Sequence, residues 1–274
     1  MIAACLGLGL VVGGIGAFFG IGGGFLVTPF LHAVIGFSAP AAVATSTAQI
    51  VLMSASGSSH YLRQKLVHLH VAALLLGGSL PAAWCTAWLI GTVQTRPFGT
   101  AIVWGGMTAA DLGLVMAYTL GIGGLGVYNL YRARPLSHPI APPTTAPDVA
   151  GARHSVEVWL TGIMTGIVSV TLGIGGGFIT FPVLVYRLRL PAAKAVATGM
   201  LVMWVTSSLA TVRYGLSGTV FWLPALLIGG AGMVGAQIGA RLAVAVSTRV
   251  VIRALGVLQA TVALVYIGSK VWHL

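Results

Sequence analysis

Charged residues are scarce in this chain, and their scarcity excludes an ordinary soluble protein. Only 6% of the 274 residues are charged and 57% are apolar, whereas about 25% of the residues in a typical soluble domain are charged. No Asp, Glu, Lys or Arg occurs in the stretches 1–62, 66–95, 112–131, 158–186 and 214–240. A bilayer core needs about 20 apolar residues for each crossing helix. The sequence therefore predicts an all-α polytopic membrane protein.

Cysteine is also rare, and its placement excludes the common metal and redox motifs. Cys5 and Cys85 stand in apolar stretches, with no partner at the spacing of a zinc, haem or redox site. The sequence contains no P-loop, so ATP-driven transport would require another subunit. We expect no metal, no cofactor and no nucleic-acid partner, since the net charge of +11 comes from scattered residues and not from a basic tract.

A proline-rich polar stretch divides the chain into two parts. Its prolines are Pro135, Pro139, Pro142, Pro143 and Pro147. This composition predicts an extended linker and not a helix. We therefore expect a first transmembrane repeat at 1–131, a cytoplasmic linker at 132–155 and a second transmembrane repeat at 156–274.

The two parts repeat each other with a constant offset of 153 residues. The run Gly-Ile-Gly-Gly-Gly-Phe occurs at 20–25 and again at 173–178, and Ala-Val-Ala-Thr occurs at 42–45 and at 195–198. The same offset relates Pro29 to Pro182, Leu31 to Leu184, Ser54 to Ser207 and Tyr61 to Tyr214. An offset that holds over roughly forty residues indicates an internal duplication.

Each half contains four hydrophobic segments, and the first segment is too long for a single helix. The segments are 1–37, 41–62, 66–92 and 98–131, then 156–186, 192–213, 219–245 and 249–272. At 1.5 Å per residue, the first would span about 55 Å as one helix, and the glycines at its middle weaken a helix. We expect a glycine-broken hairpin helix followed by three transmembrane helices in each half, with the break lining a protein-enclosed cavity.

The placement of the cations predicts that the two halves are inverted in the membrane. If each hairpin returns to its own side, each half makes three net crossings. One side then carries Arg63, Lys65, Arg132, Arg134, Arg153, Arg187, Arg189, Lys194, Arg249 and Arg253, with Arg241 nearby. The other side carries only Arg96, Arg213 and Lys270. The positive-inside rule then puts the linker in the cytoplasm and both termini outside.

The repeated glycine runs predict a binding site for an anion. New helix arms begin near Phe25 and Phe178, and a helix start presents unpaired amides and a partial positive charge. Glycine lets an anion approach that backbone closely. We therefore expect the site to include Gly22, Gly23, Gly24, Gly175, Gly176 and Gly177. The alternative is that these glycines only permit close helix packing.

Polar side chains on the next helix of each half add to this predicted site. Thr45 and Thr198 are repeat-equivalent and stand near the starts of their helices, so we expect them to donate hydroxyl hydrogen bonds. Ser46 and Gln49 follow Thr45 on the first of these helices. Ser46 corresponds to Gly199 in the second half, so the site is not fully symmetric. The alternative is that the hydroxyls bond to carbonyls of their own helices.

Asp111 is the only acidic residue inside a hydrophobic segment. Acidic residues within a membrane are functional hypotheses by default, so Asp111 is a candidate for coupling protons to anion movement. It has no counterpart in the second half, and a kink or an interfacial position is the alternative interpretation. We expect His60, His68 and His70 at the membrane interface and not in a metal site.

An enzyme interpretation has little support. Residues 54–57, Ser-Ala-Ser-Gly, are similar to the serine motif of intramembrane rhomboid proteases. Those enzymes need a glycine where Ser54 stands, and they take their base from a different helix, whereas His60 belongs to the same segment. A nucleophile and base cannot be assembled from this segment, so we expect no enzyme activity.

The duplicated glycine runs, followed by Pro29 or Pro182 and by Ala-Thr at 44–45 and 197–198, resemble the TauE/SafE family of sulfite exporters. The resemblance covers both halves. It implies a transporter of the bacterial inner membrane for sulfite or an organosulfonate such as sulfoacetate, with a site at the glycine runs, Thr45 and Thr198. It leaves open the direction of transport and whether transport is coupled to protons or to the anion gradient itself. It also leaves open whether the protein assembles into a homo-oligomer. A passive anion channel and a membrane scaffold remain alternatives.

Overall fold

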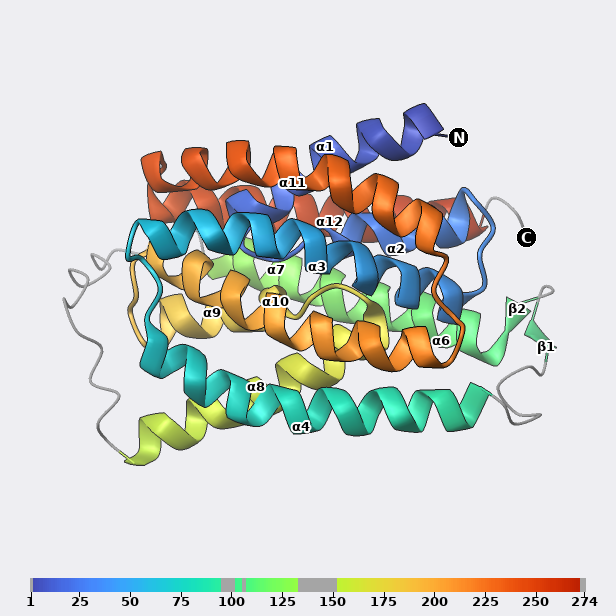
Figure 1. Ribbon diagram of the computed structural model, residues 1–274, viewed down its shortest axis with the longest axis horizontal. Helices are drawn as coiled ribbons and strands as arrows, with labels where there is room; N and C mark the ends of the chain where they lie inside the picture. Colours follow the sequence, from blue (N-terminus) through green and yellow to red (C-terminus); the bar gives the residue numbers. More distant parts are fainter. Residues whose placement is uncertain (1, 95–101, 105–106, 133–151, 272–274) are drawn as a thin grey trace.

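The computed structural model describes residues 2–94, 102–104, 107–132 and 152–271 as an elongated bundle of helices (Figure 1). Seven helices of the described chain are long and apolar enough to cross a membrane, by length and composition. These candidate spans are Ile2–Phe19, Leu69–Ile90, Ala109–Tyr131, His154–Leu172, Ala192–Leu216, Trp222–Ala245 and Val250–Gly268. The predicted all-α polytopic fold is therefore confirmed.

The first half contains a broken hairpin, two long helices and a bent helix. Its elements are α1 (Ile2–Phe19), α2 (Gly24–Ala33), α3 (Ala39–Arg63), α4 (Leu69–Gln94), strands β1 (Ile102–Trp104) and β2 (Met107–Thr108), α6 (Ala109–Ala117), the π-helix η1 (Tyr118–Gly123) and α7 (Gly124–Arg132). The predicted break of the first segment at its glycine run is present, because α1 ends at Phe19 and α2 begins at Gly24.

The second half repeats this order with nearly the same boundaries. Its elements are α8 (Ala152–Leu172), α9 (Gly177–Tyr186), α10 (Ala192–Leu216), α11 (Trp222–Ala245) and α12 (Thr248–Val271). Both bounds of α9 and α10 follow from those of α2 and α3 by adding 153, and α11 begins 153 residues after α4. The duplication read from the sequence therefore extends to the helix boundaries.

The backbone conformation repeats as well. Residues with a left-handed backbone occur in pairs separated by 153 positions, namely Gly20 with Gly173, Gly22 with Gly175, Gly36 with Arg189, and Lys65 with Gly218. One glycine breaks the pairing, because Gly176 has φ 73° whereas its counterpart Gly23 has φ −74°. The two halves therefore share their turns, but the second glycine run is wound differently from the first.

Hydrogen bonds from two tyrosines tie each hairpin to the central helix of its own half. Tyr61 donates to the carbonyl of Ala17 at 2.9 Å, and Tyr214 donates to the carbonyl of Val170 at 2.8 Å. Both carbonyls lie in the last turn of a helix, where backbone acceptors have no partner within the helix. Each tyrosine therefore satisfies a helix end that is buried inside the bundle.

Equivalent helices of the two halves run in opposite directions along the long axis of the bundle (Figure 1). The hairpin α1–α2 opens toward the end that carries both chain termini, which we call the terminal end. The hairpin α8–α9 opens toward the end where α7 stops and α8 begins, which we call the linker end. The inversion predicted relative to a membrane requires this arrangement of the helices.

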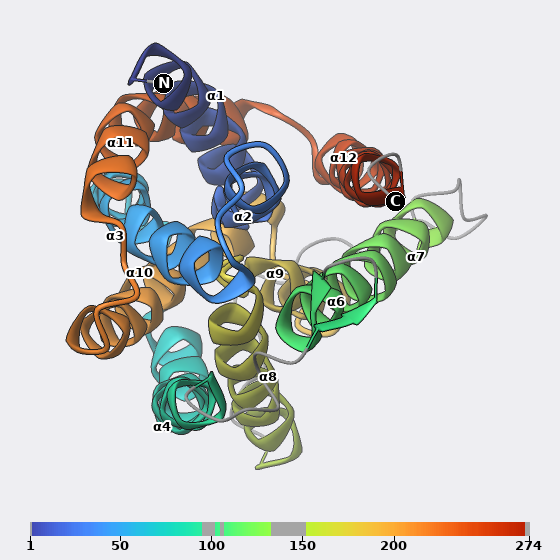
Figure 2. The ribbon, with the colours of Figure 1, turned by 90° about the vertical axis from the view of Figure 1, so that its right-hand side faces the viewer.

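The central helix α3 is the most polar long helix, and its surroundings explain why it tolerates this. It packs on α10 and α11, and the pairs α1–α11 and α4–α8 flank the centre (Figure 2). Because of its Ser, Thr and Gln side chains, α3 is not among the apolar candidate spans, although its 25 residues are long enough to cross a membrane. Buried helices need not be apolar all round when their polar groups find partners in the protein.

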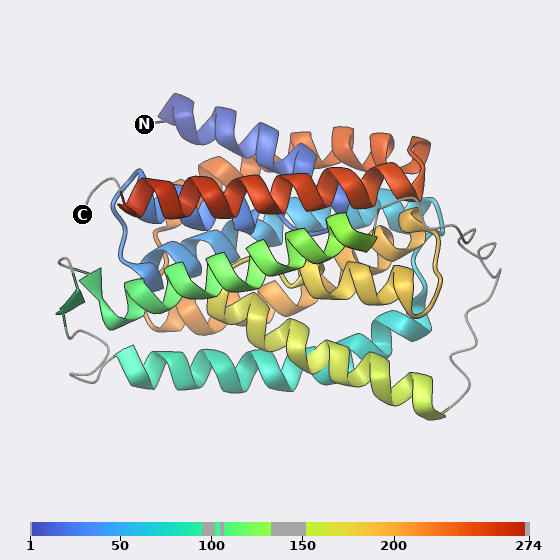
Figure 3. The ribbon, with the colours of Figure 1, turned by 180° about the vertical axis from the view of Figure 1, so that it is seen from behind.

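The bent helix α6–η1–α7 and α12 run side by side along one face of the bundle (Figure 3). They pack chiefly on each other, and more sparsely on α2, α3 and α10. The π-helix η1 interrupts the bent helix at Tyr118, near the middle of its length. We call the sparse contact of this two-helix unit, α6–η1–α7 with α12, with the rest of the bundle the seam.

The described cations gather at the linker end. Helices and loops that end there carry Arg63, Lys65, Arg187, Arg189, Lys194, Arg241 and Arg253. Of the described cationic side chains, only Arg213, in the last turn of α10, belongs to the terminal end. The predicted orientation of the protein in the membrane depends on this unequal distribution of cations.

Two predicted boundaries differ from the structure. Helix α7 includes Arg132 and helix α8 begins at Ala152, so helices extend into both ends of the linker predicted at 132–155. Its central part, residues 133–151, lies outside the described residues. The segment predicted at 98–131 becomes helical only at Ala109, after the strands β1 and β2. Ile102, Val103 and Trp104 favour extended backbone. Hydrophobicity alone did not distinguish these strands from the helix that follows them.

Candidate functional site

The tips of the two hairpins cross each other inside the bundle. A Cβ atom on Gly24 would overlap the carbonyl oxygen of Gly173, and a Cβ atom on Gly177 would overlap the carbonyl oxygen of Gly20. These two contacts are related by the offset of 153 residues. Each tip therefore packs on the backbone of the other, which only glycine permits. We call this meeting of residues 20–25 with residues 173–178 the crossing.

Apolar side chains fill the crossing. The rings of Phe25 and Phe178 are both fully buried and stack edge to face, with centroids 5.0 Å apart and an interplanar angle of 85°. The sulfur of Met203 lies against both Gly22 and Gly175, so closely that a Cβ on either glycine would overlap it. Methionine is flexible and fills irregular gaps well. In this structure the crossing is therefore closed, and its central filler is an adaptable side chain.

Four helix ends meet at the crossing. Helices α1 and α8 end there, and helices α2 and α9 begin there. The first amides of α2 and α9 carry partial positive charge and have no acceptor within their helices. The sequence-predicted glycines at 22–24 and 175–177, together with Phe25 and Phe178, are thus brought together by the fold. Whether an anion binds there stays a prediction.

The first half supplies the hydroxyl groups that bond across the crossing to the second hairpin. Ser46 donates to the carbonyl of Gly173 at 2.9 Å, and Thr28 donates to the same oxygen at 3.3 Å. Tyr118 donates to the carbonyl of Leu172 at 3.1 Å and also approaches the carbonyl of Gly24 at 3.4 Å. The positions equivalent to Ser46 and Thr28 in the second half are Gly199 and Phe181, which have no hydroxyl. In the second half, Thr180 approaches only the carbonyl of Gly176 in its own hairpin, at 3.4 Å. The hydroxyl groups that bond across the crossing, which we call its polar wall, therefore come from the first half.

Thr45 and Thr198 both lie at helix starts of the opposite half. The hydroxyl oxygen of Thr45 accepts from the backbone N–H of Phe221, which precedes α11, at 3.1 Å. The hydroxyl oxygen of Thr198 accepts from the backbone N–H of His68, which precedes α4, at 3.0 Å. Each threonine thus accepts from a backbone amide at the start of a helix of the opposite half, where the helix itself provides no acceptor. Both hydroxyl oxygens, predicted as donors, thus accept hydrogen bonds that join the two halves. The hydroxyl of Thr198 donates instead to the carbonyl of Lys194 in its own helix at 2.8 Å, as the alternative interpretation has it.

Gln49 is the clearest unsatisfied group among the predicted site residues. Its side chain is 1% exposed, and neither its amide nitrogen nor its amide oxygen has a hydrogen-bond partner in the described part of the chain. It lies one turn before Met53, whose sulfur is close to Gly23 at the crossing. The second half has Val202 at the equivalent position. A buried amide without partners costs about 1–3 kcal/mol, so its presence calls for a ligand or water partner.

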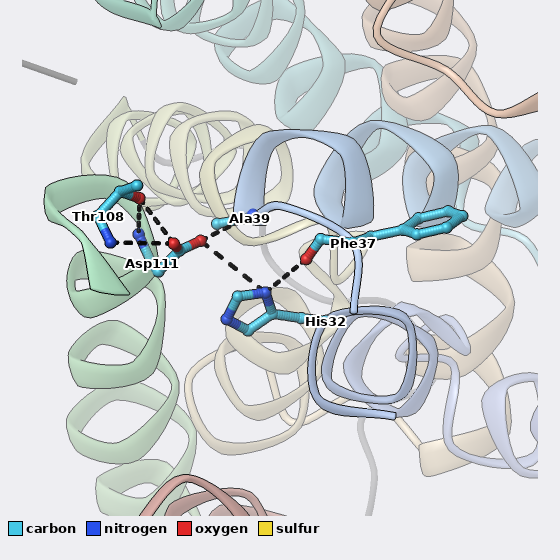
Figure 4. Close-up of polar contacts among 5 residues, drawn as sticks. All are labelled: His32, Phe37, Ala39, Thr108 and Asp111. Carbon is cyan, nitrogen blue, oxygen red and sulfur yellow. Dashed lines mark hydrogen bonds and ion pairs between the residues drawn. The ribbon is translucent and has the colours of Figure 1, made fainter. Parts of the chain in front are cut away.

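Asp111 stands at the terminal end, where it joins the starts of two helices (Figure 4). One carboxylate oxygen accepts from the backbone N–H of Ala39 at 3.0 Å, at the start of α3. The other accepts from Thr108, from its N–H at 3.1 Å and from its hydroxyl at 2.7 Å, in a capping box for α6. Asp111 also lies 3.9 Å from the Nδ1 atom of His32. This position at the helix starts is compatible both with the interfacial position and with the coupling role predicted for Asp111.

Two further residues were not predicted as functional from the sequence, namely His32 at the terminal end and Tyr118 near the crossing. His32 is a buried ionisable side chain inside an apolar hairpin arm, which is by itself a signal of function. Tyr118 opens a π-helix, a feature that is frequent at functional sites. The glycines Gly121, Gly123 and Gly124 that follow Tyr118 were an available sign of an irregular helix.

A groove of about 360 Å³ lies away from the crossing, between α3 and α11. Its lining residues are Ser56, Met233, Val234, Gln237, Ile238 and Arg241. Gln237 donates to both the carbonyl and the hydroxyl of Ser56, at 2.8 and 2.9 Å. In contrast to Gln49, this glutamine is satisfied. The described residues contain no group of three or more His, Cys, Asp or Glu that could hold a metal ion.

Comparisons with known proteins agree with one another. The family model described as sulfite exporter TauE/SafE matches residues 5–266. The probable membrane transporter protein YunE of Bacillus subtilis (strain 168) is 24% identical over 252 residues, which cover 89% of each chain. A probable membrane transporter protein of Xylella fastidiosa (strain 9a5c) is 28% identical over 122 residues, covering 44% of this chain and 46% of its own. No solved structure matches the chain.

The different winding of the two glycine runs predicts different effects of alanine. A Cβ on Gly23 would overlap Cγ1 of Val12, whereas a Cβ on Gly176 would overlap Cγ2 of Thr165 on a left-handed backbone. Gly23→Ala is therefore expected to destabilise the protein, and adding Val12→Ala should recover part of the loss, with a coupling energy of about 0.5–3 kcal/mol. Thermal unfolding of the detergent-purified variants measures this coupling.

Gly176→Ala serves as the matched comparison. Adding Thr165→Ser removes the overlapping methyl group, but the strain of a left-handed alanine, about 1–2 kcal/mol, remains. Rescue is therefore expected to be weaker at Gly176 than at Gly23. Equal rescue at both positions would show that the backbone difference between the two glycine runs does not matter.

The junction between His68 and Thr198 predicts a pH-dependent stability. The pKa of His68 lies below its ordinary 6.5, chiefly because the side chain is partly buried and also because His70 and Lys194 are nearby positive groups. The unfolded chain then binds a proton more readily than the folded chain, so stability is expected to fall as the pH drops below about 6.5. His68→Gln, which keeps the backbone N–H, should flatten this dependence.

The measurement is the apparent melting temperature between about pH 7 and about pH 5. His60→Gln is the control, because His60 lies in the last turn of α3, next to the same loop. A wild-type slope that His68→Gln leaves unchanged would contradict this assignment.

Proposed function

Because the chain belongs to the TauE/SafE sulfite exporter family, we propose that it is a secondary transporter for a small sulfur-containing anion, such as sulfite or an organosulfonate like sulfoacetate. The family assignment and the seven apolar helices make it a multi-pass transporter of the bacterial inner membrane and not an enzyme. What we propose beyond the family assignment is the class of substrate and the location of its binding site.

The observation that carries the proposal is the meeting of two half-helix starts at the buried crossing. Broken helices of this kind direct the positive ends of their dipoles toward anionic groups of a substrate. The described cationic side chains belong to the ends of the bundle, so the charge available at the crossing is that of the helix starts. Backbone amides would therefore provide the attraction for an anion.

We infer that an anion at the crossing accepts hydrogen bonds from the amides of residues 22–25 and 175–178. The side-chain amide of Gln49 would provide a further donor, and Ser46 and the threonines Thr45 and Thr198 lie on the adjoining helices. Sulfite and sulfonates carry several oxygens on one sulfur, so they can accept from several donors at once. A bound oxyanion would also supply the partner that Gln49 lacks in this structure.

Binding at the crossing requires the two hairpin tips to separate. Phe25, Phe178 and Met203 now occupy the space between them. Because Met203 is unbranched, it can change rotamer with little cost to its neighbours. In an alternating-access cycle, one hairpin would move relative to the other around the anion. The filled crossing favours such a cycle over the passive anion channel, which needs a continuous open path.

The proposed orientation places the linker end in the cytoplasm. The cations at that end satisfy the positive-inside rule if the linker is cytoplasmic and both termini are outside. The two hairpins then enter the membrane from opposite sides, as expected for inverted repeats.

The proposal predicts that Gln49 matters for anion binding but not for folding. Gln49→Leu removes an amide that has no partner, so the melting temperature of the protein without anion is expected to stay the same or to rise. The wild type should be stabilised by its substrate, by about 2.7 kcal/mol at a hundred times the dissociation constant. In Gln49→Leu this stabilisation should be lost.

Thermal unfolding of purified protein is measured with sulfite, thiosulfate, sulfoacetate, taurine, sulfate and chloride. Gln237→Leu is the matched control, because its amide donates two hydrogen bonds to Ser56 outside the crossing. This control should lower the melting temperature and keep the anion response. A full anion response in Gln49→Leu would contradict the site, and a response to none of the sulfur anions in the wild type would contradict the substrate class.

A further inference from the structure

The seam between the two-helix unit and the hairpins holds an ionisable pair at the terminal end. His32, at the end of α2, is the only buried histidine among the described residues, with 6% exposure. Its Nδ1 atom lies 3.9 Å from a carboxylate oxygen of Asp111, and both side chains are shielded, with 5% and 14% exposure. Figure 4 shows the imidazole and the carboxylate facing each other between α2 and α6.

The hydrogen bonds of this pair determine where a proton can be bound. The Nδ1 atom of His32 lies 2.8 Å from the carbonyl of Phe37, and since a carbonyl only accepts, Nδ1 carries a hydrogen and donates it. A second proton must then bind at Nε2. Asp111 is held by three donor groups of Ala39 and Thr108, which favour its ionised form. The carboxylate can therefore stay charged while the imidazole changes its charge.

Aromatic side chains connect this pair to the crossing. The ring centroid of His32 lies 6.2 Å from that of Tyr266 on α12, and the ring of Tyr266 lies 5.4 Å from that of Tyr118 on η1. Tyr118 in turn donates to the carbonyl of Leu172 at the end of α8 and approaches the carbonyl of Gly24 at the start of α2. The line of contacts thus runs from the terminal end to the tips of both hairpins.

The described residues place two titratable side chains, those of Asp111 and Tyr266, against His32. Asp111 faces it from α6 and Tyr266 faces it from α12, while Tyr118 lies behind Tyr266 on η1. Helix α3 contributes only the backbone of Ala39 to this cluster. Of the other acidic residues, Glu157 pairs with Arg187 at the linker end, and Asp148 lies outside the described residues. Among the described groups, Asp111 is therefore the carboxylate that can balance an imidazolium at His32.

We propose that His32, held beside Asp111, is the proton-binding site that couples proton movement to anion transport. The inference rests on the proposed transport function and specifies the ion that drives it. His32 takes up one proton at Nε2, and Asp111 stabilises the resulting imidazolium. Loss of this proton restores the neutral ring. Tyr266 and Tyr118 position the ring relative to the hairpin tips.

The first test needs no anion. The seven histidines are labelled in their rings, the protein is placed in nanodiscs, and the signal missing from His32→Gln identifies His32. We expect this signal to titrate within about pH 5 to 8, and its midpoint to move in Asp111→Asn, which removes the charge and keeps one carbonyl oxygen as an acceptor for one of the two helix starts. A ring that holds one protonation state over this range, or a midpoint that Asp111→Asn leaves unchanged, overturns the proposal.

The second test measures coupling in proteoliposomes with radiolabelled sulfite. Counterflow at equal pH reports anion exchange, and net uptake under an imposed pH gradient reports coupling. His32→Gln is expected to keep counterflow and to lose pH-driven net uptake, whereas the control His60→Gln keeps both. pH-driven uptake that survives in His32→Gln overturns the coupling role. Wild-type vesicles without counterflow contradict the proposed substrate class, and the ring titration then still decides whether His32 is a proton site.

Discussion

Backbone contact between the two hairpin tips is the constraint on which the rest of this structure depends. Helices broken inside an apolar bundle leave amides and carbonyls that lipid cannot satisfy. Here Gly24 and Gly177 let each tip lie directly on the backbone of the other, and Ser46, Thr28 and Tyr118 supply hydrogen bonds to the carbonyls of Leu172 and Gly173. The second hairpin therefore depends on side chains of the first half to satisfy its buried carbonyls.

The same constraint explains the distribution of polarity in the bundle. The hydroxyl and amide groups that serve the crossing lie on α3, which is buried among more apolar helices. The described charged groups lie at the bundle ends, and the carboxylate of Asp111 is tied into the helix starts at the terminal end. A polar interior inside an apolar exterior is what a transporter needs if the lipid is to be excluded from the path of its substrate.

Much of the fold could be predicted because its main signals are periodic or compositional. The charge-free stretches gave the membrane class, and the constant offset gave the duplication and the hairpin breaks. The role of Thr45 and Thr198 could not be predicted, because it depends on which helix start of the opposite half lies next to each hydroxyl. The strands β1 and β2 and the start of α6 were missed for a local reason, since hydrophobicity does not distinguish a short apolar strand from a helix.

The candidate site was only partly predictable for a similar reason. The glycines and Phe residues of the two tips do meet, and sequence repetition was enough to pair them. The closeness of His32 to Asp111 joins residues far apart in the chain with no repeat between them, so no sequence pattern signals it. The position of Met203 as a filler of the crossing was equally hidden, because its contact with both Gly22 and Gly175 depends on how the two tips meet.

The polar wall of the crossing implies that the two halves of the chain have become specialised. Ser46, Gln49 and Thr28 belong to the first half, and their counterparts Gly199, Val202 and Phe181 carry no side-chain hydrogen-bonding group. A symmetric assembly of two second halves could still cross its glycine tips, but it would lack every one of these donors. Fusion of the two halves in one polypeptide therefore fixes their ratio at one to one, so that each molecule holds one set of these donors.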